Sequence, residues 1–245
     1  MLKLLKVELR CLFRQKSTYI CLLIVIAIVA LPVLLYISDE TIDLQSTGLN
    51  LFHSSFSGSL IDILLPILIS ILVCRDFSSD AVRLIVGRGY SRTKIFFSKW
   101  ITTLIVILLF ALTAWVTIYI SLAAMLHFNM QFTPHLFMIL LTQLLAAAAI
   151  SSVAFSVAFI ARKTSAAITL GILCPTLGTI LTSVIESVLK IENGKISRFW
   201  IWSCFAQLTG DTISNDTLYF SMLLSVIWMA VFLTAGLIHF KRTDV

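Results

Sequence analysis

Charged residues are scarce in this chain. Asp, Glu, Lys and Arg make up 12% of its 245 residues, whereas 59% are hydrophobic. Soluble domains carry about a quarter charged residues. A soluble fold with this composition would expose a large apolar surface to water, which is unfavourable. The composition therefore excludes an ordinary soluble protein and favours one whose surface faces lipid.

Motifs of the common catalytic and nucleotide-binding sites are also missing. The chain has no G-x-x-x-x-G-K-[ST] loop for ATP phosphates, no H-E-x-x-H zinc motif and no G-x-S-x-G nucleophile elbow. Its four histidines lie far apart, and its five cysteines form an odd set without metal-binding spacing. We therefore expect no catalytic residue, no metal site and no cofactor in this chain.

Long apolar runs are abundant. About 20 helical residues cross the hydrocarbon core of a bilayer, and the sequence contains six runs of at least about 18. They predict an all-α, polytopic membrane protein with six transmembrane helices in a single domain, residues 1–245. The runs cover residues 18–37, 57–74, 100–126, 136–160, 165–189 and 217–240.

Basic residues lie almost entirely on one side of these six runs. Fifteen of the 18 Lys and Arg residues fall in segment 1–17, in loop 75–99, between the fourth and fifth runs, or after the last run. The positive-inside rule then places both termini in the cytoplasm and residues 190–216 in the longest external loop. The net charge of +6 follows from this bias, so we expect no nucleic-acid partner.

The N-terminal segment 1–17 is predicted to form an interfacial helix. Its apolar residues share one face at helical spacing, and its basic residues cluster on an adjoining face, as in helices that lie among lipid headgroups. The apolar face contains Leu2, Leu5, Leu9, Leu12 and Phe13, and the basic cluster contains Lys3, Lys6, Arg10 and Arg14.

Small residues mark the fourth run, and aromatic residues mark the external loop. Ala148, Ser152 and Ser156 are four residues apart, which predicts a narrow strip where another helix of the bundle approaches closely. Segment 190–216 includes two tryptophans and two phenylalanines within 199–205, which fit a short re-entrant or interfacial helix or an ordinary aromatic belt.

Ionisable residues within the predicted runs are rare. Asp62 lies in the outer half of the second run, and Glu186 lies near the outer end of the fifth. Charged groups in a membrane are costly and often mark a transport pathway, so both are candidate pathway residues, although a hydrated boundary position is an equally good interpretation. Two carboxyl groups make a poor proton relay, and energy for transport would then come from another chain.

The basic loop 75–99 is predicted to contain two helices. Apolar residues between Phe77 and Ile85 recur at helical spacing, Gly87 and Gly89 are suited to ending a helix, and Ser91 is suited to capping the next one. A short exposed helix with apolar anchors fits a groove on a soluble protein. A loop that grips anionic headgroups is the competing interpretation.

This loop resembles that of the ABC exporter permeases of the second type. The residues that match the family pattern are Asp76, Phe77, Leu84, Ile85, Gly89, Ser91, Arg92 and Lys99. The chain departs from it at Asp80-Ala81, where Gly-Thr is common, which weakens the comparison for the middle of the helix. The resemblance extends in outline over the whole chain, including its end at Phe240-Lys241-Arg242.

The resemblance implies a permease in the bacterial plasma membrane. It implies two copies of an ABC ATPase that carry ATP and Mg²⁺, a second permease copy or a paralogue, and surrounding lipids as partners. Chain size is similar to permeases of lantibiotic-immunity and toxic-peptide exporters, which indicates peptides or hydrophobic compounds as substrates. The coupling helix that meets the ATPase would include Asp76, Phe77, Asp80, Arg83, Leu84, Gly87, Gly89, Ser91 and Arg92.

Two other functions are compatible with the sequence. An ion-coupled secondary transporter would work without an ATPase and would depend on Asp62 or Glu186. A membrane immunity factor would sequester a peptide without moving it across the bilayer.

Overall fold

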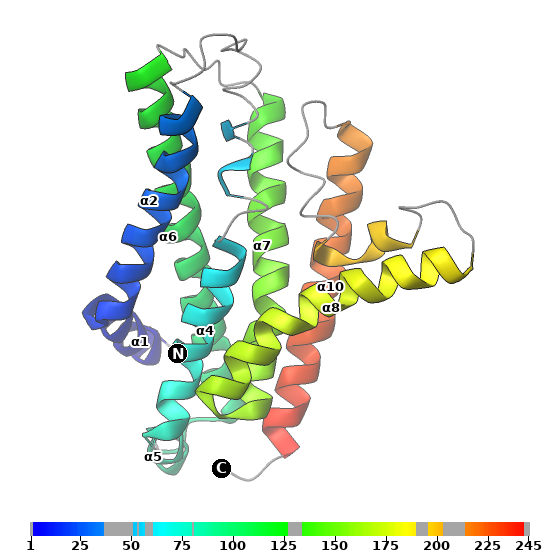
Figure 1. Ribbon diagram of the computed structural model, residues 1–245. Helices are drawn as coiled ribbons and strands as arrows, with labels where there is room; N and C mark the ends of the chain where they lie inside the picture. The colour runs from blue at the N-terminus through cyan, green and yellow to red at the C-terminus, as the bar shows by residue number, and fades with distance from the viewer. Residues whose placement is uncertain are drawn as a thin grey trace.

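The protein is almost wholly helical over the residues that its computed structural model describes. These residues are 2–36, 51–52, 54–56, 61–79, 81–126, 134–189, 196–202 and 214–242. Within them the predicted all-α class is confirmed (Figure 1). The elements are α1 (Leu2–Arg14), α2 (Lys16–Tyr36), α4 (Ile61–Ser78), α5 (Ala81–Gly87), α6 (Arg92–Leu126), α7 (Pro134–Ala161), α8 (Thr164–Val188), the 3-10 helix η1 (Ser197–Phe199) and α10 (Asn215–Arg242).

Five of these helices are long and apolar enough to cross a membrane. They are α2, α6, α7, α8 and α10, and they support a multi-pass membrane protein. The predicted run 57–74 corresponds to α4, whose 18 residues include three charged ones, Asp62, Arg75 and Asp76. The number of six spans therefore stays a prediction. Helix α6 has 35 residues and begins well before the predicted span 100–126.

Helix α7 lies at the centre of the bundle, where it contacts α4, α6, α8 and α10. Its small residues are buried, so the predicted close contact inside the bundle is confirmed. The Ser156 hydroxyl donates to the Phe232 carbonyl of α10 at 2.7 Å. A Cβ added at Gly236 would lie 2.9 Å from Ser156 Oγ, which shows how closely the two backbones approach.

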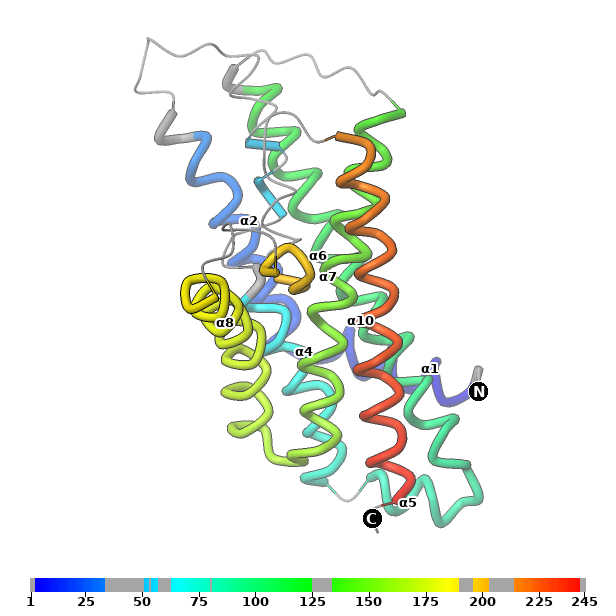
Figure 2. The backbone as a smooth tube through the Cα atoms, turned by 90° about the vertical axis from the view of Figure 1, so that its right-hand side faces the viewer, coloured from blue at the N-terminus to red at the C-terminus, as the bar shows by residue number. Residues whose placement is uncertain are grey.

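Three segments that are far apart in sequence lie at one end of the bundle. Figure 1 and Figure 2 show α5 and the last turns of α10 at this end, with α1 running across the bundle axis nearby. We call the region formed by α1, the end of α4, α5, the first turns of α6 and the end of α10 the basic end. Helix α1 and the last turns of α10 thus lie toward the same end of the bundle, and the cytoplasmic location of both termini stays a prediction.

Helix α8 bends away from the bundle in its second half (Figure 1). Pro175 lies in the middle of this helix, and proline removes a backbone donor and kinks a helix. The segment after α8 folds back against it: the Trp200 indole N–H donates to the Pro175 carbonyl at 2.9 Å. Trp200 also contacts Trp228 of α10 edge to face, so η1 joins α8 to α10.

Candidate functional site

The basic end contains the connection between α4 and α6, which the sequence predicted as loop 75–99. In the structure most of this segment is helical, because α4 continues to Ser78, α5 covers Ala81–Gly87 and α6 begins at Arg92. Helix α5 turns one side toward the bundle and the other toward solvent. Val82 is 1% exposed, whereas Leu84 is 66% exposed. Asp80, a predicted contact residue, lies outside the described residues.

Glycine ends α5 as predicted. Gly89 has a φ of +84°, in the left-handed region. Its N–H donates to the Val86 carbonyl at 2.9 Å, and the Tyr90 N–H donates to the Ile85 carbonyl at 3.4 Å. These two bonds form the Schellman arrangement, which satisfies carbonyl groups at a helix end. Gly87, the second predicted glycine, is the last residue of α5 and carries no positive φ.

Replacing Gly89 by Ala is expected to destabilise the end of α5 by about 1–2 kcal/mol, because a residue with a Cβ is strained at this φ. The measurement is amide hydrogen exchange over residues 84–91, which we expect to accelerate roughly fivefold or more. Gly87→Ala is the matched control, since a Cβ there meets nothing within 4 Å. Equal exchange rates in the two variants would contradict the assignment.

Ser91 precedes α6 and occupies the predicted capping position. Its carbonyl accepts the N–H groups of Lys94 and Ile95 at 3.0 and 3.2 Å, which begins the helix. Arg92, the first residue of α6, reaches the other end of the chain: its guanidinium donates to the carbonyls of Phe240 and Lys241, each at 3.1 Å. A cation at the last carbonyls of a helix is electrostatically favourable. Arg92 therefore joins segment 75–99 to α10.

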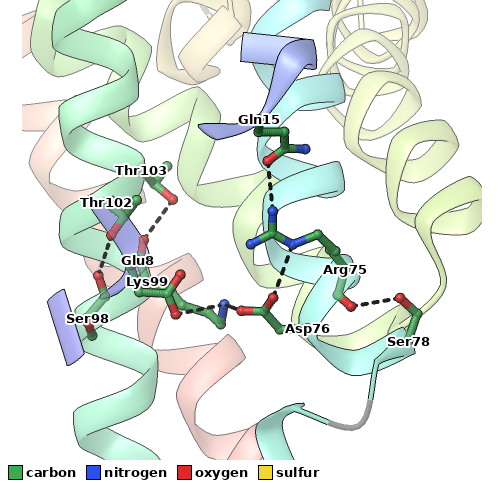
Figure 3. Close-up of polar contacts among 9 residues, drawn as sticks. All are labelled: Glu8, Gln15, Arg75, Asp76, Ser78, Ser98, Lys99, Thr102 and Thr103. Carbon is green, nitrogen blue, oxygen red and sulfur yellow. Dashed lines mark hydrogen bonds and ion pairs between the residues drawn. The ribbon is translucent and has the colours of Figure 1, made fainter. Parts of the chain in front are cut away.

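A buried ionic cluster lies at the base of the same segment (Figure 3). The Lys99 side chain is 3% exposed, and its ammonium pairs with the carboxylates of Asp76 and Glu8, the latter at 3.1 Å. These three residues come from α6, α4 and α1. A buried ammonium needs such partners, since burial of an unpaired charge is very costly. One lysine thus holds three helices together.

A second polar bridge runs beside this cluster. The Arg75 guanidinium contacts the Asp76 carboxylate at 3.3 Å and donates to the Gln15 side-chain carbonyl at 3.2 Å. Figure 3 shows the two bridges side by side, with Glu8 of α1 in one and Gln15, the residue between α1 and α2, in the other. The end of α4 is therefore tied both to α1 and to the junction between α1 and α2.

Phe77 lies in an aromatic cluster. Its ring packs edge to face against Phe159 of α7 at 5.4 Å and Phe240 of α10 at 6.1 Å between centroids. The Arg162 guanidinium lies 5.7 Å from the centre of the same ring. Apolar spacing predicted Phe77 and Leu84 on one face of a single helix. The structure instead places Phe77 in α4 and Leu84 in α5, because α4 ends at Ser78 and α5 begins at Ala81. Phe77 anchors the segment to the bundle.

Three functional candidates were missed by the sequence analysis: Glu8, Gln15 and Arg162. Glu8 did carry a signal, because it is the sole acidic residue of segment 1–17 and lies four residues from both Leu4 and Leu12. A carboxylate on the buried face of an amphipathic helix needs a cationic partner. Neither Gln15 nor Arg162 has a comparable signal, since both are ordinary residues at a helix end.

The two candidate pathway residues lie elsewhere. Asp62 is in the first turn of α4, and its side chain lies outside the described part of the chain. Glu186 is 3% exposed, and its carboxylate accepts the backbone N–H groups of Ile196 and Ser197 at 2.6 and 2.7 Å. These bonds give Glu186 a structural role at the start of η1, and its place in a pathway stays a prediction.

Comparisons with known proteins define the family and leave the activity open. The family described as "Protein of unknown function (DUF2705)" matches residues 11–245, nearly the whole chain. No curated protein matches the sequence. Among the described residues, no group of three His, Cys, Asp or Glu side chains lies together as a metal site would require. Any proposal about function therefore depends on the geometry of the basic end.

Proposed function

We propose that this chain, which belongs to the DUF2705 family of proteins of unknown function, is the membrane-spanning permease subunit of an ATP-driven exporter. The support comes from the likeness of segment 75–99 to ABC exporter permeases and from the geometry of the basic end. In this proposal α4 is a sixth span, both termini are cytoplasmic, and the protein resides in a bacterial plasma membrane. The 15-to-3 division of basic residues supports that orientation.

The proposal depends mainly on the way α5 packs on the bundle and exposes its outer side. The helix is seated on the bundle by Val82 and is ended firmly at Gly89, while Leu84 projects with 66% of its surface exposed. Arg83 and Arg88 are exposed on the same short segment. An apolar anchor bordered by basic residues suits a groove that has an apolar centre and an acidic rim. We assign this groove to the ATPase subunit.

ATP and Mg²⁺ would then bind to two ATPase subunits, and this chain would contribute no catalytic residue. Closure of the ATPase pair would displace α5. The displacement would reach α7 and α10 through Phe77 and through the bonds of Arg92 to the end of α10. Nucleotide binding thereby biases a bundle with two arrangements, because the ATPase contacts differ between them.

The transported substrate would pass between two permeases, either two copies of this chain or a copy and a paralogue. Amphipathic peptides or hydrophobic compounds are the proposed substrate class, in keeping with the size and outline of the chain. A path lined by apolar helices with few charges suits such molecules, because they need little polar compensation within the bilayer.

Replacement of Leu84 by Ser tests the proposal. We expect the ATPase to be retained about 30- to 150-fold more weakly, since an apolar anchor in a groove contributes roughly 2–3 kcal/mol. The measurement is the amount of ATPase that remains with the tagged chain in mild detergent. Val7→Ser is the matched control, because Val7 is an exposed apolar residue, 62% exposed, that belongs to α1 and not to α5.

Two results would overturn the proposal. One is a wild-type chain that retains no ATPase, and the other is equal retention by Leu84→Ser and wild type. If Leu84→Ser weakened binding to anionic vesicles but not retention of the ATPase, α5 would instead be a segment that contacts lipid headgroups. Ion-driven uptake by the purified chain alone would favour a secondary transporter.

A further inference from the structure

Helix α1 has two chemically different sides. The side toward the bundle contains Leu4 and Leu12, which are 8% and 0% exposed. Glu8 lies on the same side, four residues from each of these leucines, and Gln15 directly follows the end of α1. The outer side exposes Val7 and Phe13 among lysines and arginines, which suits a helix on an anionic membrane surface.

Glu8 of α1 and Gln15, the residue between α1 and α2, both contact the coupling segment. Glu8 reaches Asp76 through the shared Lys99 ammonium, and Gln15 reaches Arg75 directly. The two contacts are seven residues apart in sequence, one on α1 and the other at its junction with α2. Asp76 and Arg75 lie in the last turn of α4, close before α5 in sequence. A movement of α1 relative to α6 would therefore displace the end of α4, which lies shortly before α5 in the chain.

We propose that α1 positions the coupling helix α5, with Glu8 acting as the positioning residue through Lys99. This inference rests on the proposed function in one respect, that α5 is the part of the chain which the ATPase contacts. Glu8 itself touches Asp76 only through the Lys99 ammonium. Its task is to keep Lys99 between the two carboxylates and thereby fix the end of α4.

The shared cation explains why a positioning residue is needed here. Lys99 is on α6 and Asp76 is on α4, and the segment that contains α5 connects these two helices. With Glu8 present, the ammonium is held from the α1 side and the α4 side at once. Without Glu8, Lys99 keeps one carboxylate and the fold survives, but α1 loses an attachment to the end of α4.

Replacing Glu8 by Leu tests this inference on the full chain in lipid nanodiscs. The new side chain fits between Leu4 and Leu12, so α1 stays on the bundle while its ionic contact is lost. We expect amide exchange over residues 75–90 to rise about tenfold, because loss of a charge-assisted hydrogen bond allows local opening. Exchange in α7 is expected to remain unchanged, whereas a merely structural loss would accelerate both regions.

Val7→Leu is the matched control, since it enlarges a neighbouring exposed residue of α1 and leaves the cluster intact. Glu8→Gln, which keeps the shape of the side chain, provides the same test if the leucine variant does not fold. A second readout uses the complex with its ATPase: ATP hydrolysis continues in Glu8→Leu, while transport per ATP falls.

The outcomes separate this inference from the proposed function. Amide exchange is measured on the chain without an ATPase. A wild-type chain that binds no ATPase would therefore overturn the exporter proposal but would not affect the positioning role of Glu8. Unchanged exchange over 75–90 in both Glu8 variants, or an equal rise in Val7→Leu, overturns the positioning role alone.

Discussion

Replacement of Lys99 by Met is expected to lower the free energy of unfolding by about 3–5 kcal/mol. The substitution removes the buried ammonium and leaves the carboxylates of Glu8 and Asp76 facing each other, with the Arg75 guanidinium still beside Asp76. Two desolvated like charges repel, and neither can be exposed to water without moving α1 or α4. The loss therefore exceeds that of an ordinary surface lysine.

Unfolding in mixed micelles with increasing denaturing detergent provides the measurement. Lys94→Met is the matched control, because Lys94 lies on the same helix and is exposed, and its replacement is expected to change stability by less than about 0.5 kcal/mol. The triple variant Glu8→Gln, Asp76→Asn, Lys99→Met is expected to recover most of the loss, since it removes the unpaired charges together. A Lys99→Met variant as stable as the Lys94 control would show that the cluster contributes nothing.

Replacement of Gly178 by Ala is expected to destabilise the protein by about 2–4 kcal/mol. A Cβ at this position would overlap Cε2 and Cζ2 of the Trp200 ring, which lies directly against the α8 backbone. The ring would have to leave, and with it the hydrogen bond from its Nε1 to the Pro175 carbonyl and its edge contact with Trp228. The attachment of η1 to α8 and α10 would be lost together with these contacts.

The same unfolding measurement, combined with a double-mutant cycle, tests this second effect. Once Trp200 is replaced by Ala, the ring atoms that the added methyl group at residue 178 would overlap are gone, so Gly178→Ala is expected to cost less than about 1 kcal/mol in that background. Gly87→Ala again serves as control, because nothing lies within 4 Å of its Cβ. Additive losses in the double variant would refute the close approach of Trp200 to α8.

Local sequence accounts for much of the fold. Long apolar runs predicted the helices because a chain in lipid must satisfy its backbone hydrogen bonds within each segment. The glycine at residue 89 and the serine at 91 predicted where α5 ends and α6 begins, since both signals act within a few residues. Ala148, Ser152 and Ser156 likewise predicted a close helix contact, because small side chains at a spacing of four form a strip on any helix.

Such local patterns could not predict which residues form the ionic cluster. Asp76 and Lys99 were recognised as matching a family pattern, but their pairing with Glu8 joins residues that are up to 91 positions apart. Phe77 was expected on the same face as Leu84, but it lies in α4, where its ring packs against Phe159 and Phe240. Spacing along one helix cannot predict such contacts, because they depend on how other helices are placed.

The sequence by itself determined that the chain is a helical membrane protein with a strong charge asymmetry and a short helix between α4 and α6. These properties depend on composition and on interactions within a few residues. The tertiary structure alone decided that Lys99 joins three helices, that Arg92 caps the end of α10 and that Trp200 fills the space at Gly178. Each depends on the packing of distant segments, where a single buried charge or ring finds its partner only after the helices have assembled.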